Sequence, residues 1–153
     1  MVSAHVRPRV AALVGPTAAG KTRTLVAWRR VGLPVEAVNV DALQVYRGVD
    51  AGTAKPDAEE RSAVPTWLLD VAAPTDAWNA ARHALLADTV IAEIAGRGAW
   101  PVLVGGTGLY VRAVLAGMAD IPAVPVEVRA GLADEWTSRG PQALHDELAA
   151  VDP

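Results

Sequence analysis

Eight residues near the N-terminus have the types and spacing of a loop that binds phosphate. They are Gly15, Pro16, Thr17, Ala18, Ala19, Gly20, Lys21 and Thr22. The run satisfies the pattern G-x-x-x-x-G-K-[ST], in which successive backbone N–H groups converge on an anion at the start of a helix. Lys21 would supply a point charge for the outer phosphate, and the Thr22 hydroxyl would ligate Mg²⁺. The motif predicts a phosphate or diphosphate site.

Asp41 is the second candidate for chemistry because it follows an apolar segment, residues 35–40, that has the length of a strand. In open α/β sheets, ligands bind at the carboxyl ends of the strands. A carboxylate there could ligate Mg²⁺, act as a general base, or only cap the following loop. Gln44 could bond to a base edge or to the loop backbone, and Tyr46 and Arg47 could contact a nucleic acid or simply lie at the surface. The spacing alone leaves these alternatives open.

Lysine is rare in this chain, and both lysines lie in motif-like places. Arginine outnumbers lysine twelve to two, with Lys21 in the phosphate loop and Lys55 in the sequence Gly-Thr-Ala-Lys-Pro. A chain that uses arginine almost everywhere else has kept lysine at these two positions, which marks Lys55 as a further candidate.

The elements that must position these residues alternate along the chain. Strands are predicted over residues 10–14, 35–40, 67–71 and 101–104, and helices over residues 22–31, 57–63, 78–95, 109–115, 126–137 and 142–149. The apolar residues that suit the long helix 78–95 are Ala81, Leu85, Val90, Ile91 and Ile94. Residues 41–56 should form a long ordered loop beside the phosphate site, and glycines 105, 106 and 108 should again place backbone N–H groups at the ligand end of the sheet. This order predicts an α/β fold, a parallel sheet covered by helices.

Composition excludes several classes of function. The 153 residues are 52% apolar and 20% charged, as in a globular domain, and the absence of cysteine excludes disulfides, thiolate catalysis and cysteine-bound zinc. The three histidines are scattered, so a dedicated metal cage is not expected. The net charge of −3 means that a nucleic acid would have to be bound by a local patch. We expect no membrane span and no secretion signal, and therefore a cytoplasmic protein.

Four separated segments resemble the tRNA dimethylallyltransferases, also called tRNA isopentenyltransferases. They are the phosphate loop, residues 41–56, residues 104–110, and the C-terminal residues 127–129 with 144–153. The resemblance runs from about Val10 to the last residue. It implies a P-loop NTPase-like fold and the transfer of a dimethylallyl group from dimethylallyl diphosphate to N6 of the adenosine next to the tRNA anticodon, with Mg²⁺ as cofactor.

The resemblance also implies roles for individual residues. Asp41 would take the proton from N6, and Thr17 would hydrogen-bond the bridging oxygen of the leaving diphosphate. The residues expected to touch the tRNA anticodon stem-loop are Asp41, Ala42, Leu43, Gln44, Thr107 and Arg129. The enzyme is expected to act as a monomer, away from membranes.

The sequence departs from the family pattern in places and in length. Ala42 stands where the family has serine, and residues 65–67 and 76–79 differ from the usual motifs. Family members are much longer, so residues 1–120 are predicted to be a partial P-loop core and residues 121–153 the truncated start of a helical insertion. Transfer activity is therefore expected to be impaired. The alternatives are a small-molecule P-loop kinase and a non-catalytic remnant that binds nucleotide or tRNA.

Overall fold

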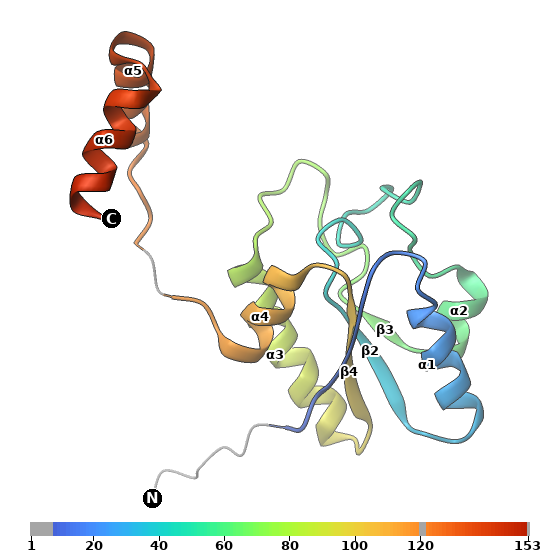
Figure 1. Ribbon diagram of the computed structural model, residues 1–153. Helices are drawn as coiled ribbons and strands as arrows, with labels where there is room; N and C mark the ends of the chain where they lie inside the picture. Colours follow the sequence, from blue (N-terminus) through green and yellow to red (C-terminus); the bar gives the residue numbers. More distant parts are fainter. Residues whose placement is uncertain (1–7, 120–121, 153) are drawn as a thin grey trace, which may run out of the picture. The chain divides into compact units, whose positions relative to one another are not determined.

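The computed structural model describes residues 8–119 and 122–152 of the chain. It contains two compact units, Met1–Met118 and Ala119–Pro153, and each is described by itself (Figure 1). The interpretation of the two parts as a P-loop core and the start of a helical insertion stays a prediction.

The first unit is built on a four-stranded parallel sheet. Its strands are β1 (Ala11–Val14), β2 (Val35–Asn39), β3 (Thr66–Trp67) and β4 (Trp100–Gly105), in the spatial order β1-β4-β2-β3. Its helices are α1 (Lys21–Arg30), α2 (Ala58–Ala63), α3 (Ala80–Gly96) and α4 (Gly108–Ala116). The predicted parallel sheet covered by helices is confirmed.

Helices cover both faces of the sheet, as the apolar strands require. Side chains alternate between the faces along each strand. Val38 and Leu103 pack in a cluster with the apolar side of α3 and α4, whereas Ala37 and Val102 pack in a second cluster around Leu25 of α1. Figure 1 shows α3 and α4 on one side of the sheet and α1 on the other. The two clusters hold the strand ends, and the loops that follow them, in fixed places.

Two helices begin later than predicted because their first polar residues are caps. Asp57 precedes α2 and accepts a hydrogen bond from Glu60 N at 2.8 Å, while its own N–H donates to Glu60 Oε2. Asn79 precedes α3, and its Oδ1 accepts from Arg82 N at 2.9 Å. The prediction that Ala81 and Leu85 belong to the apolar side of the long helix that packs on the core is wrong, since both are exposed, Leu85 by 73%. The buried side of α3 consists of Ala80, His83, Ala87, Ile91 and Ile94.

The third strand is shorter than predicted. Only Thr66 and Trp67 pair with β2, and the rest of the predicted segment 67–71 leaves the sheet. Leu68 and Asp70 have φ of 62° and 54°, which is left-handed backbone and incompatible with a strand. The segment instead turns toward the long loop, where Ala72 forms an isolated bridge with Tyr46.

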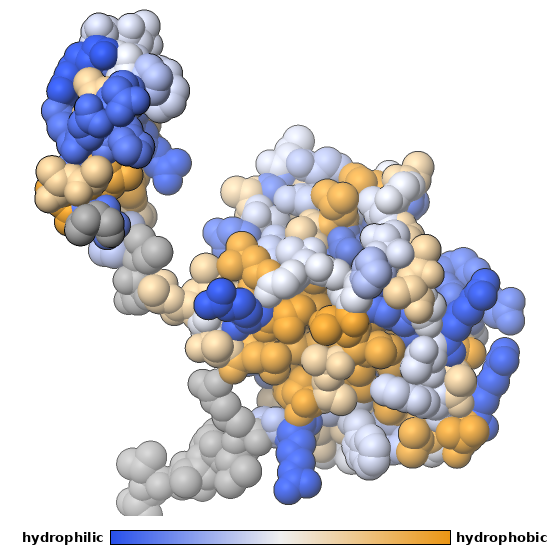
Figure 2. Space-filling view, in the orientation of Figure 1, coloured by the Kyte–Doolittle hydropathy of each residue, from blue (hydrophilic) through white to orange (hydrophobic). Residues whose placement is uncertain are grey.

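Strand β1 lies at the edge of the described sheet and is poorly covered. It pairs with β4 from Ala11–Val102 to Val14–Gly105, and all of its residues except Leu13 are exposed. Figure 2 shows apolar side chains gathered over the part of the surface where β1 and α4 lie. The edge of the sheet beside the phosphate loop is therefore apolar as well as accessible.

The second unit is a pair of helices, α5 (Val126–Arg139) and α6 (Pro141–Val151), which confirms both helices predicted in this region. The two helices are joined at Gly140, which has φ of 80°, and Arg139 forms ion pairs with Glu135 of α5 and Glu147 of α6. An apolar groove of about 1090 Å³ runs along the pair, lined by Leu132, Trp136, Leu144 and Leu148 among others. None of the described residues of these helices is buried. Within the pair itself, the apolar side is thus left uncovered.

Within residues 8–119 and 122–152, no helix combines the length and the apolar character that crossing a bilayer requires.

Candidate functional site

The phosphate motif forms a turn between β1 and α1, the context that the sequence predicted. Ala18 and Gly20 have φ of 64° and 83°, so the backbone curls back on itself before Lys21 begins the helix. Gly15 N donates to Gly105 O at 3.3 Å, which ties the start of the loop to the end of β4. No side chain of the described residues caps the N-terminus of α1. Its first N–H groups and its partial positive charge are therefore available to an anion.

Lys21 places its ammonium group over this turn. Nζ donates to the carbonyl oxygens of Gly15 at 3.0 Å and Pro16 at 2.8 Å. A point charge is thus held beside the N–H groups of the loop, the arrangement that suits the terminal phosphate of a bound ligand.

The ends of three strands meet at this point because the sheet is parallel and two glycines allow a close approach. A Cβ on Gly105 would lie 2.6 Å from the carbonyl carbon of Val40, and a Cβ on Gly106 would lie 3.2 Å from Gly15 O. The glycine cluster predicted from the sequence thus serves a second purpose, which is to let β4 touch the segment after β2. That contact brings Asp41 to the side of the phosphate loop.

The phosphate loop and the loop after β2 face one cleft of about 360 Å³. Its lining residues come from four segments of the chain. They are Thr17, Ala18, Ala19, Gly20, Lys21, Thr22, Arg23, Asp41, Gln44, Thr53, Ala54, Lys55, Glu60, Val104 and Gly105. The predicted catalytic and diphosphate-binding residues other than Gly15 and Pro16 therefore line a single cleft.

Asp41 caps the turn that follows it, one of the three roles left open by the sequence. Its Oδ1 accepts hydrogen bonds from Leu43 N at 2.9 Å and from Gln44 N at 3.4 Å. Thr107, at the start of α4, accepts a hydrogen bond from Ala42 N at 3.1 Å through its Oγ1. Five of the six residues predicted to contact tRNA, Asp41 to Gln44 and Thr107, are thus brought together. Asp41 and Gln44 line the cleft, and we call these five residues the rim.

Arg129, the sixth, belongs to α5 in the second unit. It lines the apolar groove of that helix pair, and its contact with tRNA stays a prediction.

Two residues that support Asp41 were missed by the sequence analysis. Asn39, 2% exposed at the end of β2, accepts from Asp41 N at 3.1 Å through Oδ1 and donates from Nδ2 to Leu68 O at 3.1 Å. The Nε2 of the fully buried His83 lies 2.8 Å from Asn39 O. Burial lowers the pKa of His83 from its usual value, and the bond to Asn39 offsets this only in part, so the ring is neutral near pH 7. The only hint in the sequence is a polar residue within the apolar run before Asp41.

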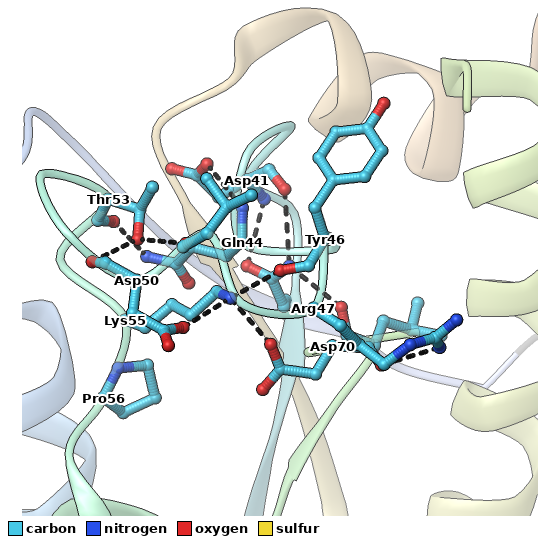
Figure 3. A network of polar contacts seen from close by, with 12 residues as sticks. Asp41, Gln44, Tyr46, Arg47, Asp50, Thr53, Lys55, Pro56 and Asp70 are labelled. Atoms are coloured by element: carbon cyan, nitrogen blue, oxygen red, sulfur yellow. Dashed lines mark hydrogen bonds and ion pairs between the residues drawn. The ribbon is translucent and has the colours of Figure 1, made fainter. Parts of the chain in front are cut away.

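The loop of residues 41–56 is held by a network of polar contacts (Figure 3). Gln44 Nε2 donates to the carbonyl oxygens of Thr53 at 2.9 Å and Ala54 at 3.1 Å, so its amide binds the loop backbone, one of the two predicted alternatives. Arg47 also contacts backbone, with Nη1 donating to Asp70 O at 3.3 Å. The predicted ordered loop beside the phosphate site is confirmed.

Lys55 is the centre of that network. Burial alone would lower the pKa of Lys55, but its hydrogen bonds and charge interactions with Asp50 and Asp70 outweigh burial and raise it. Burial would likewise raise the pKa of Asp70, and the bonds from Lys55 and Arg61 lower it instead. Both groups are therefore charged at neutral pH.

Oxygen ligands for a divalent cation are available in the cleft. Among the described residues, no group of three or more His, Cys, Asp or Glu side chains is placed to hold a metal ion by itself. Thr22 and Asp41 line the same cleft and offer hydroxyl and carboxylate oxygens, the hard donors that Mg²⁺ prefers. Such a site suits a metal that is held jointly by the protein and by phosphate oxygens of a ligand.

The chain matches a family model over more than half of its length and curated proteins over nearly all of it. A family model described as IPP transferase matches residues 44–153. The chain is 53% identical to a tRNA dimethylallyltransferase of Anaeromyxobacter dehalogenans (strain 2CP-C), over 95% of this chain and 48% of that protein. It is 48% identical to one from Stenotrophomonas maltophilia (strain R551-3), over 96% of this chain and 46% of that protein. The chain thus spans about half the length of the curated relatives that it matches.

Solved structures agree with these relatives. The full-length tRNA isopentenylpyrophosphate transferase of Bacillus halodurans matches with a TM-score of 0.70 and 44% identity, over 95% of this chain and 48% of that one. A eukaryotic dimethylallyltransferase solved while acting on tRNA matches with a TM-score of 0.67 and 22% identity, over 78% of this chain and 31% of that one, a likeness in fold alone. The predicted P-loop NTPase-like fold is confirmed.

Proposed function

This chain belongs to the tRNA dimethylallyltransferase (IPP transferase) family, and from that premise we propose that it supplies the donor site and the base for transfer of a dimethylallyl group to tRNA. The observation that carries the proposal is the single cleft lined by both the phosphate loop and Asp41. The donor is dimethylallyl diphosphate and the acceptor is N6 of the adenosine next to the anticodon.

The phosphate loop binds the diphosphate of the donor. Its backbone N–H groups, the N-terminus of α1 and the Lys21 ammonium converge on one side of the cleft. As the bond between the prenyl carbon and the diphosphate oxygen breaks, negative charge develops on that oxygen, and fixed donors stabilise it. Thr17 lines the cleft at this position and donates to the bridging oxygen.

Asp41 receives the proton in this reaction. The N6 amine attacks the prenyl carbon, the diphosphate leaves with the bonding electrons, and the extra proton on N6 passes to the carboxylate. Oδ1 already accepts two backbone N–H groups, whereas Oδ2 has no donor among the described residues. The bonds to Oδ1 orient the carboxylate and leave Oδ2 for the incoming proton.

Mg²⁺ fits the oxygen donors of this cleft and completes the donor site. Thr22 is the residue that would hold it, together with the diphosphate. When bound, it neutralises part of the charge on the diphosphate.

The acceptor is the anticodon stem-loop of a tRNA. The target adenosine has to leave the base stack before its N6 can enter the cleft. Unstacking a base costs the least free energy in a single-stranded loop. Asp41, Ala42, Leu43, Gln44 and Thr107 form the rim that would meet the base, and Arg129 of the second unit would contact the tRNA. Work on tRNA would place the protein in the cytoplasm, where it would act as a monomer.

A ligand-dependent thermal shift tests the donor site. Unfolding is followed with Mg²⁺ plus dimethylallyl diphosphate and, separately, with Mg²⁺ plus ATP. A ligand at about 100 times its dissociation constant adds roughly 2.7 kcal/mol to the free energy of unfolding. We expect the prenyl diphosphate to stabilise the wild type and not Lys21→Met, and a preference for ATP would favour the kinase instead.

A transfer assay with Asp41→Asn tests the base. The asparagine keeps an oxygen for the two N–H groups of the turn but cannot take a proton. We expect it to bind the donor as the wild type does and to lose at least about a hundredfold in transfer rate. Equal transfer rates in the two proteins would exclude Asp41 as the base, and binding without any transfer in the wild type would favour the non-catalytic remnant.

A further inference from the structure

Lys55 has a buried ammonium group with a partner for each of its protons. Its side chain is 4% exposed, and Nζ donates to Tyr46 O at 2.6 Å, Asp50 Oδ1 at 2.8 Å and Asp70 Oδ1 at 2.6 Å (Figure 3). An ammonium group has three donors, so its bonding capacity is filled. Filling all three offsets the cost of taking the charge out of water.

The three acceptors come from segments that otherwise have little regular structure. Tyr46 and Asp50 belong to the long loop, whereas Asp70 follows β3 and has the left-handed φ of 54°. Arg61 of α2 holds the other oxygen of Asp70, with Nη1 2.8 Å from Oδ2. Lys55 and Arg61 thus join the long loop to α2 and to the segment after β3, through one carboxylate.

The residues next to Lys55 connect it by hydrogen bonds to the residues that line the cleft. Thr53 and Ala54, which directly precede it, present the two carbonyl oxygens that bind the Gln44 amide. The backbone N–H of Gln44 then donates to Asp41 Oδ1. Asp70 N adds a hydrogen bond to Gln44 O at 3.2 Å, so the groups fixed by Lys55 hold Gln44 at both its side chain and its backbone.

We propose that Lys55 is a positioning residue, whose three bonds fix the loop segment from which Gln44 and Asp41 face the phosphate loop. Lys55 also lines the cleft, and a direct contact with a phosphate is the obvious alternative. The alternative is disfavoured because a contact with phosphate would have to break a bond to Tyr46, Asp50 or Asp70. The positioning role of Lys55 does not depend on the proposed function. Only the reaction that Gln44 and Asp41 would serve rests on it.

The chemistry of this position also explains why it is lysine in an arginine-rich chain. The three acceptors surround a single nitrogen, whereas a guanidinium group presents its donors in a flat fork. The Lys55 side chain is 4% exposed, so the space around it is closed. An arginine side chain is longer and wider and would not fit into that space. We therefore expect Lys55→Arg to behave like a loss of the residue and not as a conservative change.

The side-chain amide of Gln44 reports on this arrangement directly. Its ¹H–¹⁵N signals are recorded for the wild type, Lys55→Met and Lys55→Arg, with Gln44→Ala to assign them. We expect both Lys55 variants to move these signals to the position of an unbound amide, while Arg30→Met, an exposed change on α1, leaves them in place. Calorimetry with inorganic pyrophosphate should give both Lys55 variants affinities within about threefold of that of the wild type.

The transfer rate gives a second reading. A displacement of about 1 Å at a reacting group can cost about a hundredfold in rate. We expect Lys55→Met to lower kcat by about this factor with donor binding retained. The NMR and calorimetric results do not depend on transfer, so they decide the role of Lys55 even if the proposed function fails.

Three results would overturn the inference. They are unchanged Gln44 signals in Lys55→Met, wild-type behaviour of Lys55→Arg, and a fall of more than tenfold in pyrophosphate affinity, which would make Lys55 a phosphate ligand. If Lys55→Met does not fold, Asp50→Ala takes its place. This substitution removes one of the three acceptors of Lys55, and the Asp50 side chain is 70% exposed, so the protein should still fold. It should move the Gln44 signals in the same direction by a smaller amount, and unmoved signals would contradict the inference.

Discussion

His83 is a fully buried residue whose protonation state matters for the core of the first unit. The ring is fully buried between Trp78 and Tyr110, with ring centroids 6.0 and 4.9 Å away. Nε2 donates to Asn39 O, and Nδ1 has no partner among the described residues. A second proton on this ring would place an uncompensated charge in an apolar cluster.

We predict that this unit loses stability as the pH falls below about 6.5. Burial lowers the folded-state pKa of His83, so above the unfolded-state value the ring is neutral in both states and stability is complete. Below that value the unfolded chain takes up a proton that the folded chain refuses, and the free energy of unfolding decreases. Denaturant titrations at about pH 7.5 and about pH 5.5 measure the effect.

Variants of two histidines separate this cause from others. His83→Phe should flatten the pH dependence, because an aromatic ring remains but no longer binds a proton. His145→Gln is the control, because the His145 side chain is 72% exposed. This substitution should leave the pH dependence of the first unit's stability unchanged. An unaltered pH dependence in His83→Phe would contradict the assignment.

The sequence pointed to the charged residues of the site better than to the buried polar ones. Asp41 was foreseen from its place after a strand, and Lys55 from its rarity in an arginine-rich chain. Asn39 and His83 were not, because an isolated polar residue on an apolar element does not reveal which backbone group it will meet. Their partners are set by packing between β2 and α3, which depends on residues distant in the sequence.

At the scale of elements, the contact between the ends of β2 and β4 decides where the site lies. It depends on Gly105, which sits against the backbone of Val40 with no room for a side chain. The same residue receives the hydrogen bond from Gly15, the first residue of the phosphate loop. One glycine therefore sets the distance between the donor site and Asp41.

We predict that Gly105→Ala destabilises the first unit by about 1–3 kcal/mol, the usual cost of overpacking. The new methyl group would meet backbone atoms, which move less readily than side chains. Gly108→Ala is the matched control, because nothing lies within 4 Å of its position at the start of α4. It should be neutral or stabilise by up to about 1 kcal/mol, since alanine favours helix. Equal effects in the two variants, measured by denaturant titration, would contradict this account.

The helices and strands were predicted well where the apolar pattern extends over many residues. They were predicted poorly where the backbone adopts a left-handed conformation. The four helices of the first unit and three of its strands lie close to their predicted ranges. The third strand was overestimated because an apolar run such as Trp67-Leu68-Leu69 does not show that Leu68 will adopt a left-handed conformation. Ala81 and Leu85 were misplaced because apolar spacing alone does not show that α3 turns Ala80, His83 and Ala87 toward the core.

At the scale of the whole molecule, charge limits the binding of an anionic partner. The chain carries a net charge of −3, and none of the five rim residues, Asp41 to Gln44 and Thr107, is itself basic. Arg129 is the one cation among the residues that the family resemblance assigns to tRNA, and Arg47, the other candidate, donates to Asp70 O. Attraction to the phosphate backbone, which supplies much of the affinity of most RNA-binding proteins, should therefore be weak.

We predict that an anticodon stem-loop binds this chain with a shallow dependence on salt. The slope of log K against log salt concentration follows the number of phosphates neutralised, so it should be no steeper than about −2. Fluorescence anisotropy between about 50 and 200 mM salt measures it, with Arg129→Ala as the comparison. A steep slope that survives this substitution would reveal a basic surface elsewhere in the chain.

The pairing of β1 with β4 has a consequence for the order of events during synthesis. Ala11 is made early, yet its partner is Val102, and Gly15 hydrogen-bonds to Gly105. At about 5–20 residues per second, a ribosome needs on the order of 5 to 20 s to make the intervening stretch. Throughout that interval the apolar β1 has no strand to pair with and can contact chaperones and other nascent chains. The phosphate loop, although it precedes most of the first unit in the sequence, is thus among the last parts of that unit to take shape.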